Sequence, residues 1–411
     1  MSLIKHSLFN VTGFAIPTLI AVPCLGILAR WIGVESFGLF TLAFAIVGYT
    51  SIFDAGLSRA VIREISIYGN DFEEQKKILA TVNILILFLS TLASVLLFFY
   101  CDLLVSFLEV SSALHQIAIE SFQVLSFIMP FFLFNQIWLG YLEGKEKFLN
   151  INVQRVISSS LIAILPLAFC IGHRNLLFAI YGLLVARIIA MLITFYSCKD
   201  ILLASGVKFH QATFNRIIQF GGWITVSNVI SPLMVYFDRF IVSNILGANK
   251  VAYYTAPSEG VTRLVNIPSA LSRVLFPKLS SSDNKIERAR LEKQAYIILV
   301  LVCLPLTVLV ILFAKQIMTL WMGVEYGGVS AQVLQILMLG FFFNALAQIP
   351  FTVIQSKGLA KTTAIVHMFE LLPYLIILYL FSINFGLVGT AWAWTIRVMV
   401  DFIILLKLSR V

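Results

Sequence analysis

The chain has 411 residues, of which 60% are hydrophobic and 12% are charged, and its mean hydropathy is +0.96. Soluble domains carry about 25% charged residues, and a chain this apolar would expose large apolar patches in water. A soluble enzyme is therefore excluded, and the long apolar runs indicate membrane-spanning helices rather than the short alternating strands of a barrel. The formal net charge of +9 lies mostly beside these runs, so it does not indicate nucleic-acid binding.

At about 20 residues per span, the sequence predicts about twelve helices. In chain order they cover residues 7–29, 37–57, 78–100, 116–142, 151–171, 176–198, 216–245, 250–272, 294–314, 329–355, 362–382 and 387–407. The first apolar run is too long for the core of a cleavable signal. The connections are too short for a catalytic domain, which argues against an enzyme such as a membrane glycosyltransferase. Residues 278–293 fit either a helix on the cytoplasmic headgroups or a solvated connector.

Five cysteines are scattered along the chain without the CxxC or CxxH spacing of a metal site. An odd, dispersed set predicts neither a disulfide framework nor a structural zinc site. We therefore interpret these cysteines as small apolar side chains within helices, and we predict no metal and no cofactor.

Basic residues in the connections predict the orientation of the chain. Alternate connections, counted from the N-terminus, hold twenty Lys and Arg residues, whereas the opposite side holds four: Arg30, Arg174, Lys250 and Lys315. Because cytoplasmic connections carry the excess of basic residues, we expect both termini to be cytoplasmic. The even number of spans agrees with this orientation.

Two segments recur at about half the chain length. Residues 29–43 align with residues 243–257 at an offset of 214. Residues 123–135 align with residues 332–344 at an offset of 209, with seven identical positions that include a glutamine and an asparagine. Polar residues in a fixed register are harder to obtain by chance than apolar ones, which indicates an internal duplication.

The duplication predicts two six-helix bundles, residues 1–205 and 206–411. An even number of helices gives both bundles the same orientation, related by a pseudo-twofold axis along the membrane normal. In such an architecture the two bundles rock against each other and give alternating access to a cavity between them. The predicted class is therefore an all-α polytopic transporter.

Residues 27–66 resemble the opening signature of the Wzx-type O-antigen flippases, polysaccharide transporters of the multidrug/oligosaccharidyl-lipid/polysaccharide exporter superfamily. The matching elements are Arg30, Gly33, the run Glu35-Ser36-Phe37-Gly38, the run Asp54-Ala55-Gly56-Leu57, and Arg63-Glu64-Ile65. The second half matches more weakly, through Asp238, Arg239, Gly247, Tyr254 and Pro257.

The resemblance implies a MATE-like fold and translocation of an undecaprenyl-pyrophosphate-linked oligosaccharide, an O-antigen-type repeat unit, across the bacterial inner membrane. It implies the lipid-linked substrate and membrane lipids as partners, with a polysaccharide polymerase, a chain-length regulator and H⁺ or Na⁺ as further candidates. A multidrug or small-solute cation-coupled antiporter of the same fold is the alternative, since composition does not separate the two. The sugar composition, the coupling ion and the oligomeric state stay open.

Five arginines lie within the predicted spans: Arg155, Arg187, Arg239, Arg263 and Arg397. A charge at the bilayer centre costs about 2.5–3.5 kcal/mol, so such side chains are expected to face a bundle interior or a wet cavity. A guanidinium offers paired hydrogen bonds to phosphate. Arg187, which has no acid three or four residues away, is therefore the main candidate for binding the pyrophosphate. The further candidates are Arg30, Arg239, Arg263 and Arg397.

Three of these arginines have simpler explanations. Arg263 follows Glu259 by four residues, and Arg397 precedes Asp401 by four residues. Each pair therefore fits an ion pair within its own helix. Arg155 lies near a predicted cytoplasmic helix end, where its side chain can extend to the headgroups.

Acids within the spans are candidates for coupling transport to an ion gradient. Asp54 and Glu370 have no basic residue four positions away, and His367 precedes Glu370 by one helical turn. We predict Asp54, Glu370 and His367 as coupling residues for H⁺ or Na⁺. A buried, hydrogen-bonded His367–Glu370 pair without a coupling role is the alternative.

Overall fold

The computed structural model of the chain describes residues 3–54, 56–281 and 284–410. These residues are almost entirely helical, and no strand occurs among them. The α-helices are α1 (Leu3–Ile32), α2 (Val34–Thr50), α3 (Leu57–Ile67), α4 (Phe72–Phe107), α5 (His115–Gly144), α6 (Phe148–Phe169), α7 (Leu176–Ser205), α8 (Gln211–Leu246), α9 (Ala248–Leu264), α10 (Asn266–Ser281), α11 (Lys285–Leu312), α12 (Ala314–Met322), α13 (Val329–Ser356) and α14 (Ala360–Ser409). Two short 3₁₀ helices, η1 (Ser51–Asp54) and η2 (Val324–Gly327), complete the order. The predicted all-α class is confirmed.

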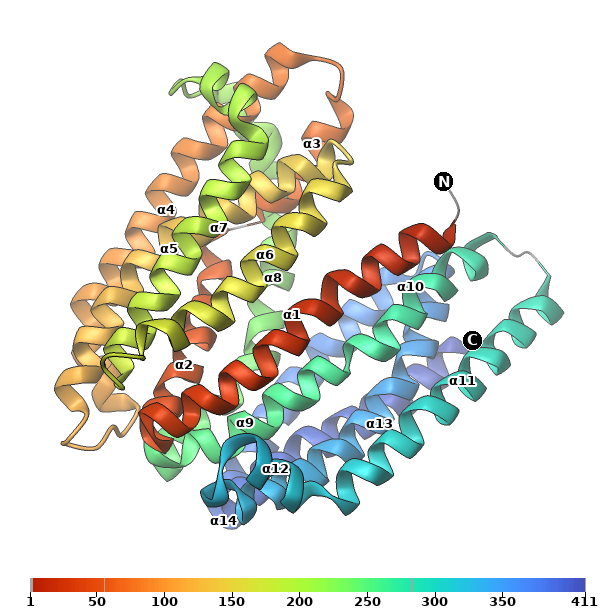
Figure 1. The fold of residues 1–411 in the computed structure, drawn as a ribbon. Coiled ribbons are helices and arrows are strands. Elements are labelled where there is room, and N and C mark those ends of the chain that lie inside the picture. The colour runs from red at the N-terminus through yellow and green to blue at the C-terminus, as the bar shows by residue number, and fades with distance from the viewer. Residues whose placement is uncertain (1–2, 55, 282–283, 411) are drawn as a thin grey trace. The chain divides into compact units, whose positions relative to one another are not determined.

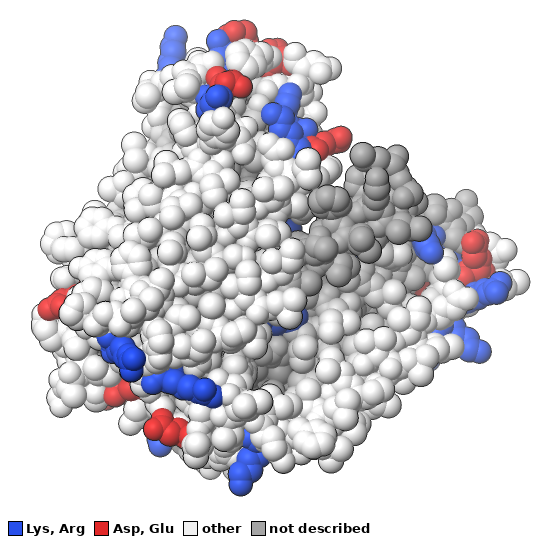
Figure 2. Space-filling model, viewed as in Figure 1, with Lys and Arg blue, Asp and Glu red and all other residues white. Residues whose placement is uncertain are grey.

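Eight of the described helices are long and apolar enough to cross a membrane. Their outer side chains are apolar as well: on α4, Leu87, Phe88, Phe99 and Leu103 are between 55% and 75% exposed. On the face shown in Figure 2, Lys, Arg, Asp and Glu gather toward the ends of the helices and leave a broad uncharged surface between them. Such a surface would be unfavourable in water and fits a lipid environment.

The chain divides into two compact units, residues 1–237 and 238–411. Within the first unit, α5 packs against α2, α3, α4, α6 and α7. Within the second unit, α13 packs against α9, α10, α11, α12 and α14. Figure 1 shows α4, α5 and α7 side by side in the first unit, and α11 beside α13 in the second. The division falls inside α8, and the predicted bundle boundary at residue 205 stays a prediction.

The elements of the two units follow the duplication detected in the sequence. Gly33 precedes α2 and Gly247 precedes α9, and both glycines have a positive φ, of 83° and 90°. Both helices then run for 17 residues. The second repeated segment lies in α5 and in α13, the two helices that make the most partners in their units. The repeated sequence therefore specifies repeated elements.

Two segments differ from the predicted spans. Residues 58–77, expected to be a polar connection, contain α3, in which Leu57, Ala60, Val61 and Ile65 are buried as one apolar face. The span predicted over 250–272 is two helices, α9 and α10, divided at Val265. The last two predicted spans agree with the structure, because α14 consists of two helices that meet at a kink where Gly386 has a non-helical φ of 59°. The charge pattern of residues 58–77 indicated a loop, whereas the tertiary structure buries the apolar face of α3.

Most of the predicted connection at residues 278–293 is helical too. Lys278 lies within α10, which continues to Ser281, and α11 begins at Lys285 after the cap residue Asn284. The side-chain amide oxygen of Asn284 accepts from the backbone N–H of Ile286. The segment is therefore built mainly from the ends of two long helices, not from one separate helix on the headgroups.

An ionic network ties α3 to α4 and to the beginning of α8. The Glu64 carboxylate, 3% exposed, accepts from Arg216 Nε at 3.1 Å and from Arg63 at 3.0 Å. Arg216 also donates to Glu74 at 3.0 Å and lies over the ring of Tyr68 at 5.0 Å. Because Glu64 and Arg216 are separated by 152 residues, this contact fixes the start of α8 on the first unit.

Candidate functional site

Arg187 lies in the middle of α7 and is half-buried. Its guanidinium carbon lies 5.0 Å from the ring centre of Phe132 on α5. Its buried Nε has no hydrogen-bond partner among the described residues, and Arg187 forms no ion pair with any of them. Stacking on an aromatic ring fixes the plane of a guanidinium while its N–H groups stay free to donate. The predicted anion-binding residue therefore has a suitable geometry.

A second arginine of the predicted set, Arg239, is fixed by contacts within the second unit. Its side chain is 4% exposed, and one terminal nitrogen donates to Glu259 at 2.8 Å. The backbone N–H of Arg239 donates to Asp238, and Tyr254 donates its hydroxyl proton to the same carboxylate at 2.6 Å. The predicted pair of Arg263 with Glu259 is therefore wrong, because Glu259 faces α8 and binds Arg239 instead.

The predicted pair of Arg397 with Asp401 is wrong as well. Arg397 Nε lies 4.0 Å from Glu370, and its guanidinium lies 5.5 Å from the ring centre of Tyr374. Asp401 instead lies beside His367, with 3.7 Å between Nε2 and the nearer carboxylate oxygen. Residues from the two parts of α14 thus meet across the break at Gly386, which the spacing within each helix alone cannot show.

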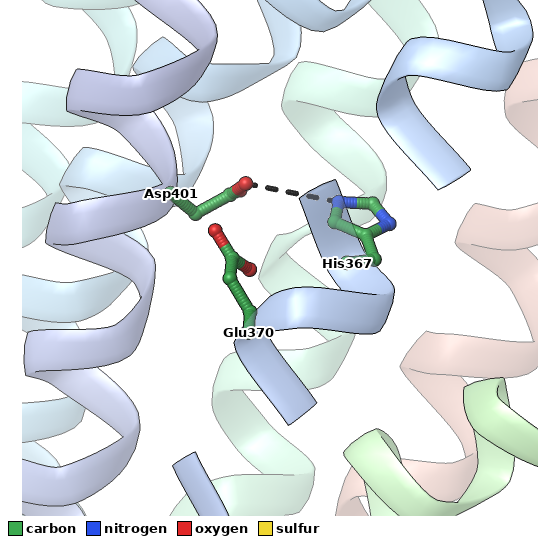
Figure 3. A group of neighbouring side chains, drawn as sticks. All are labelled: His367, Glu370 and Asp401. Carbon is green, nitrogen blue, oxygen red and sulfur yellow. Dashed lines mark ion pairs between the residues drawn. The ribbon is translucent and has the colours of Figure 1, made fainter. Parts of the chain in front are cut away.

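These contacts bring three residues together, and Figure 3 shows them pointing toward one another. His367, Glu370 and Asp401 each offer one ligand atom, and these atoms all lie within 4.8 Å of one another. Glu370 is 9% exposed and Asp401 is 7% exposed. Both oxygens of Glu370 and one of Asp401 lack a hydrogen-bond partner among the described residues. The direct His367–Glu370 pair weighed from the sequence is thus replaced by a three-residue cluster that includes Asp401.

Two further candidates, Asp54 and Arg30, belong to the first unit. The buried carboxylate of Asp54 accepts from the backbone N–H of Ser58 at 3.1 Å and from the Ser58 hydroxyl at 2.9 Å. This contact closes the first turn of α3, as a helix cap does. Arg30 is exposed in the last turn of α1. Asp54 thus has a structural role, and its predicted coupling role stays a prediction.

The sequence pattern of the polysaccharide biosynthesis protein family matches residues 3–283. A Shigella flexneri protein named "Putative O-antigen transporter" is 45% identical over 405 residues, which cover 98% of this chain and 97% of that protein. The chain belongs to the polysaccharide biosynthesis protein family. A more distant relative is the "Uncharacterized membrane protein EpsK" of Bacillus subtilis, 23% identical over 87% of this chain and 72% of its own length.

Solved structures identify the fold. A multidrug resistance MATE family transporter of the MOP superfamily, in an inward-facing conformation, matches with a TM-score of 0.80 and 20% identity over 98% of this chain and 97% of its own. The lipid II flippase MurJ, in an inward closed conformation, matches with a TM-score of 0.81 and 17% identity over 98% of this chain and 87% of its own. The family member therefore has the MATE-like fold that the resemblance implied.

Proposed function

We propose that this protein is a flippase that moves an undecaprenyl-pyrophosphate-linked oligosaccharide across the bacterial inner membrane by alternating access. The observation that carries the proposal is the 45% identity, over nearly the full length of both chains, to a protein named as an O-antigen transporter. The fold, shared with a lipid II flippase, is compatible with a lipid-linked substrate. The excess of basic residues on alternate connections supports cytoplasmic termini.

Arg187 is the residue we assign to the pyrophosphate. A charged side chain within a span is costly unless it is paired or serves a ligand, and the described residues give Arg187 a ring to stack on but no acid. A pyrophosphate carries negative charge and accepts the paired hydrogen bonds that a guanidinium offers. Arg239 and Arg397, which have acid partners, are less available for this role.

The assignment is tested by restoring surface polysaccharide in a strain that lacks this transporter. Loss of one charge-assisted hydrogen bond costs about 1.5–3 kcal/mol, or about 10- to 150-fold in a binding step, so Arg187→Ala is expected to lower restoration strongly. Arg187→Lys keeps the charge but loses the planar fork, and it should fall between Arg187→Ala and the wild type. The matched control is Lys199→Ala, because Lys199 lies on the same helix and also over an aromatic ring, Tyr196, at 4.8 Å.

Membrane levels of every variant are measured alongside, so that failed insertion is not counted as lost transport. If Arg187→Ala inserts normally and restores full polysaccharide, Arg187 is structural and the site assignment is wrong. If the wild-type protein itself restores nothing, the flippase proposal fails. A cation-coupled antiporter of drugs or small solutes is the second candidate on this fold, and drug efflux without polysaccharide export would favour it.

A further inference from the structure

The first unit carries an uncharged residue at the position that corresponds to Glu370 when the two units are aligned by their helix ends. α5 ends at Gly144 and α13 ends at Ser356, 212 residues later, and α6 begins at Phe148 and α14 at Ala360, also 212 residues later. On this spacing, Glu370 occupies the position that Ser158 has in the first unit. Both positions are buried, with 9% and 6% of the residue exposed.

Asp401 has a neutral counterpart as well. α7 begins at Leu176, and the second part of α14 begins after Gly386, at Leu387, 211 residues later. On this spacing Asp401 corresponds to Ala190, which is 1% exposed against 7% for Asp401. By helix ends, the first unit therefore has a buried serine and a buried alanine at these two positions. Two buried acids at these positions call for an explanation outside packing.

The charges of the cluster do not balance when His367 is neutral. Glu370 and Asp401 contribute two negative charges, and Arg397, 4.0 Å from Glu370, contributes one positive charge. Among the described residues no further ion pair reaches the cluster: α13 contributes the uncharged ring of Phe351, stacked on His367 at 6.0 Å, and the acids of α8 and α9 are bound to Arg239 and Tyr254. A buried excess charge is unfavourable unless a cation accompanies it.

The ligand atoms indicate which cation fits. Hard metal cations such as sodium, magnesium and calcium prefer oxygen ligands, whereas one of the three ligand atoms is an imidazole nitrogen. A divalent ion would also leave an excess positive charge beside Arg397. A single proton leaves the cluster neutral, whether the imidazole of His367 carries it or the carboxyls of Glu370 and Asp401 share it, and Arg397 faces Glu370.

We propose that His367, Glu370 and Asp401 form the site of one exchangeable proton, and, on the basis of the proposed function, that this proton is coupled to flipping. Uptake of the proton adds one positive charge and breaks no other bond. The cluster joins the two parts of α14 across Gly386, so loss of the proton leaves Glu370 and Asp401 repelling each other across that break. Proton release thereby favours separation of the two parts, and uptake favours their contact.

The test uses the purified, substrate-free protein in lipid nanodiscs. Infrared difference spectra are recorded between about pH 6 and about pH 9. Exposed carboxylates stay ionised over this range, so they contribute no protonation change. The wild type should show a carboxyl or imidazole band that both Glu370→Gln and Asp401→Asn alter. A double change, Glu370→Ser with Asp401→Ala, copies the first-unit residues and should fold and lose the band. Glu120→Gln is the control, because Glu120 lies near the start of α5 and its carboxylate accepts an exposed hydrogen bond from Gln116.

Spectra in sodium chloride and in choline chloride separate the proton from sodium. A band that sodium abolishes, or a band unchanged in the folded double variant, overturns the proposal. In the polysaccharide assay the double variant should lower export relative to the wild type and to Glu120→Gln. If the wild type exports polysaccharide but shows no such band, the proton site is wrong and the flippase proposal stands. If the band is present but the wild type exports no polysaccharide, the flippase proposal fails and the proton site stands.

Discussion

Replacing Arg216 with glutamine tests whether the start of α8 is held on the first unit by Glu64. In the native protein Arg216 Nε lies 3.1 Å from Glu64, and a terminal nitrogen lies 3.0 Å from Glu74. Arg216→Gln leaves the Glu64 carboxylate, which is 3% exposed, with Arg63 as its remaining cation. The Arg63 side chain is 47% exposed, so water screens this remaining pair.

The expected cost follows from these exposures. Removal of one partner from a fully buried pair costs about 3–5 kcal/mol, because it leaves a buried charge uncompensated. The Arg216 side chain is 36% exposed, and screening reduces the expected cost to about 2–3 kcal/mol. At about 2–4 °C per kcal/mol for a unit of this size, Arg216→Gln should lower the Tm by about 4–12 °C.

The assay follows the reaction of a thiol-reactive dye with the cysteines during heating. Cys101, Cys170, Cys198 and Cys303 are buried, so they react as the protein unfolds. A double-mutant cycle with Glu64→Gln should give a coupling energy of about 1–2 kcal/mol. The control is Lys76→Gln: Lys76 pairs with Glu73 at 2.7 Å, but Glu73 is 71% exposed, and less than about 1 kcal/mol should be lost. Equal Tm shifts for Arg216→Gln and Lys76→Gln, or a coupling energy near zero, would refute the reasoning.

Two further predictions concern the backbone and the topology. Gly33 has a φ of 83° with a ψ of 166°, a conformation that almost only glycine adopts, and a Cβ added there would meet no heavy atom within 4 Å. Gly33→Ala should therefore cost about 1–3 kcal/mol from the backbone alone. Gly172→Ala, at an equally open position without a positive φ, should leave the Tm unchanged, and equal effects of the two changes would contradict this account. The excess of basic residues on alternate connections predicts a cytoplasmic C-terminus. A phosphatase fused after Val411 should therefore stay inactive, and strong activity would reverse the orientation.

Apolar run length and the internal repeat were sufficient to predict the class of fold. A membrane-spanning helix must be apolar over about 20 consecutive residues, whatever its neighbours in the fold. The composition of short stretches of the sequence is therefore enough to detect it. The pairing of Gly33 with Gly247 also predicted a structural equivalence, because a positive φ is a local requirement that glycine meets most easily. The resemblance in residues 27–66 indicated the family, which the matched pattern over residues 3–283 confirms.

The candidate site was predicted less well. Helical spacing placed Glu370 and His367 together correctly, since one turn separates them. The same rule paired Arg397 with Asp401 and Arg263 with Glu259, and both assignments were wrong. Spacing of four residues allows an ion pair on an isolated helix, but a neighbouring helix that offers a better-placed partner takes precedence.

The sequence by itself therefore determined the helical membrane class, the repeat, the family and the candidate residues, because these depend on short windows of the chain. The tertiary structure alone decided the partners: Arg216 with Glu64 across 152 residues, Arg239 with Glu259, and Asp401 with His367 across the break at Gly386. The physical reason is that a charge buried among helices is stabilised by the nearest opposite charge in space. The distance between two opposite charges depends on how the helices pack, and it cannot be derived from the spacing of the residues along the chain.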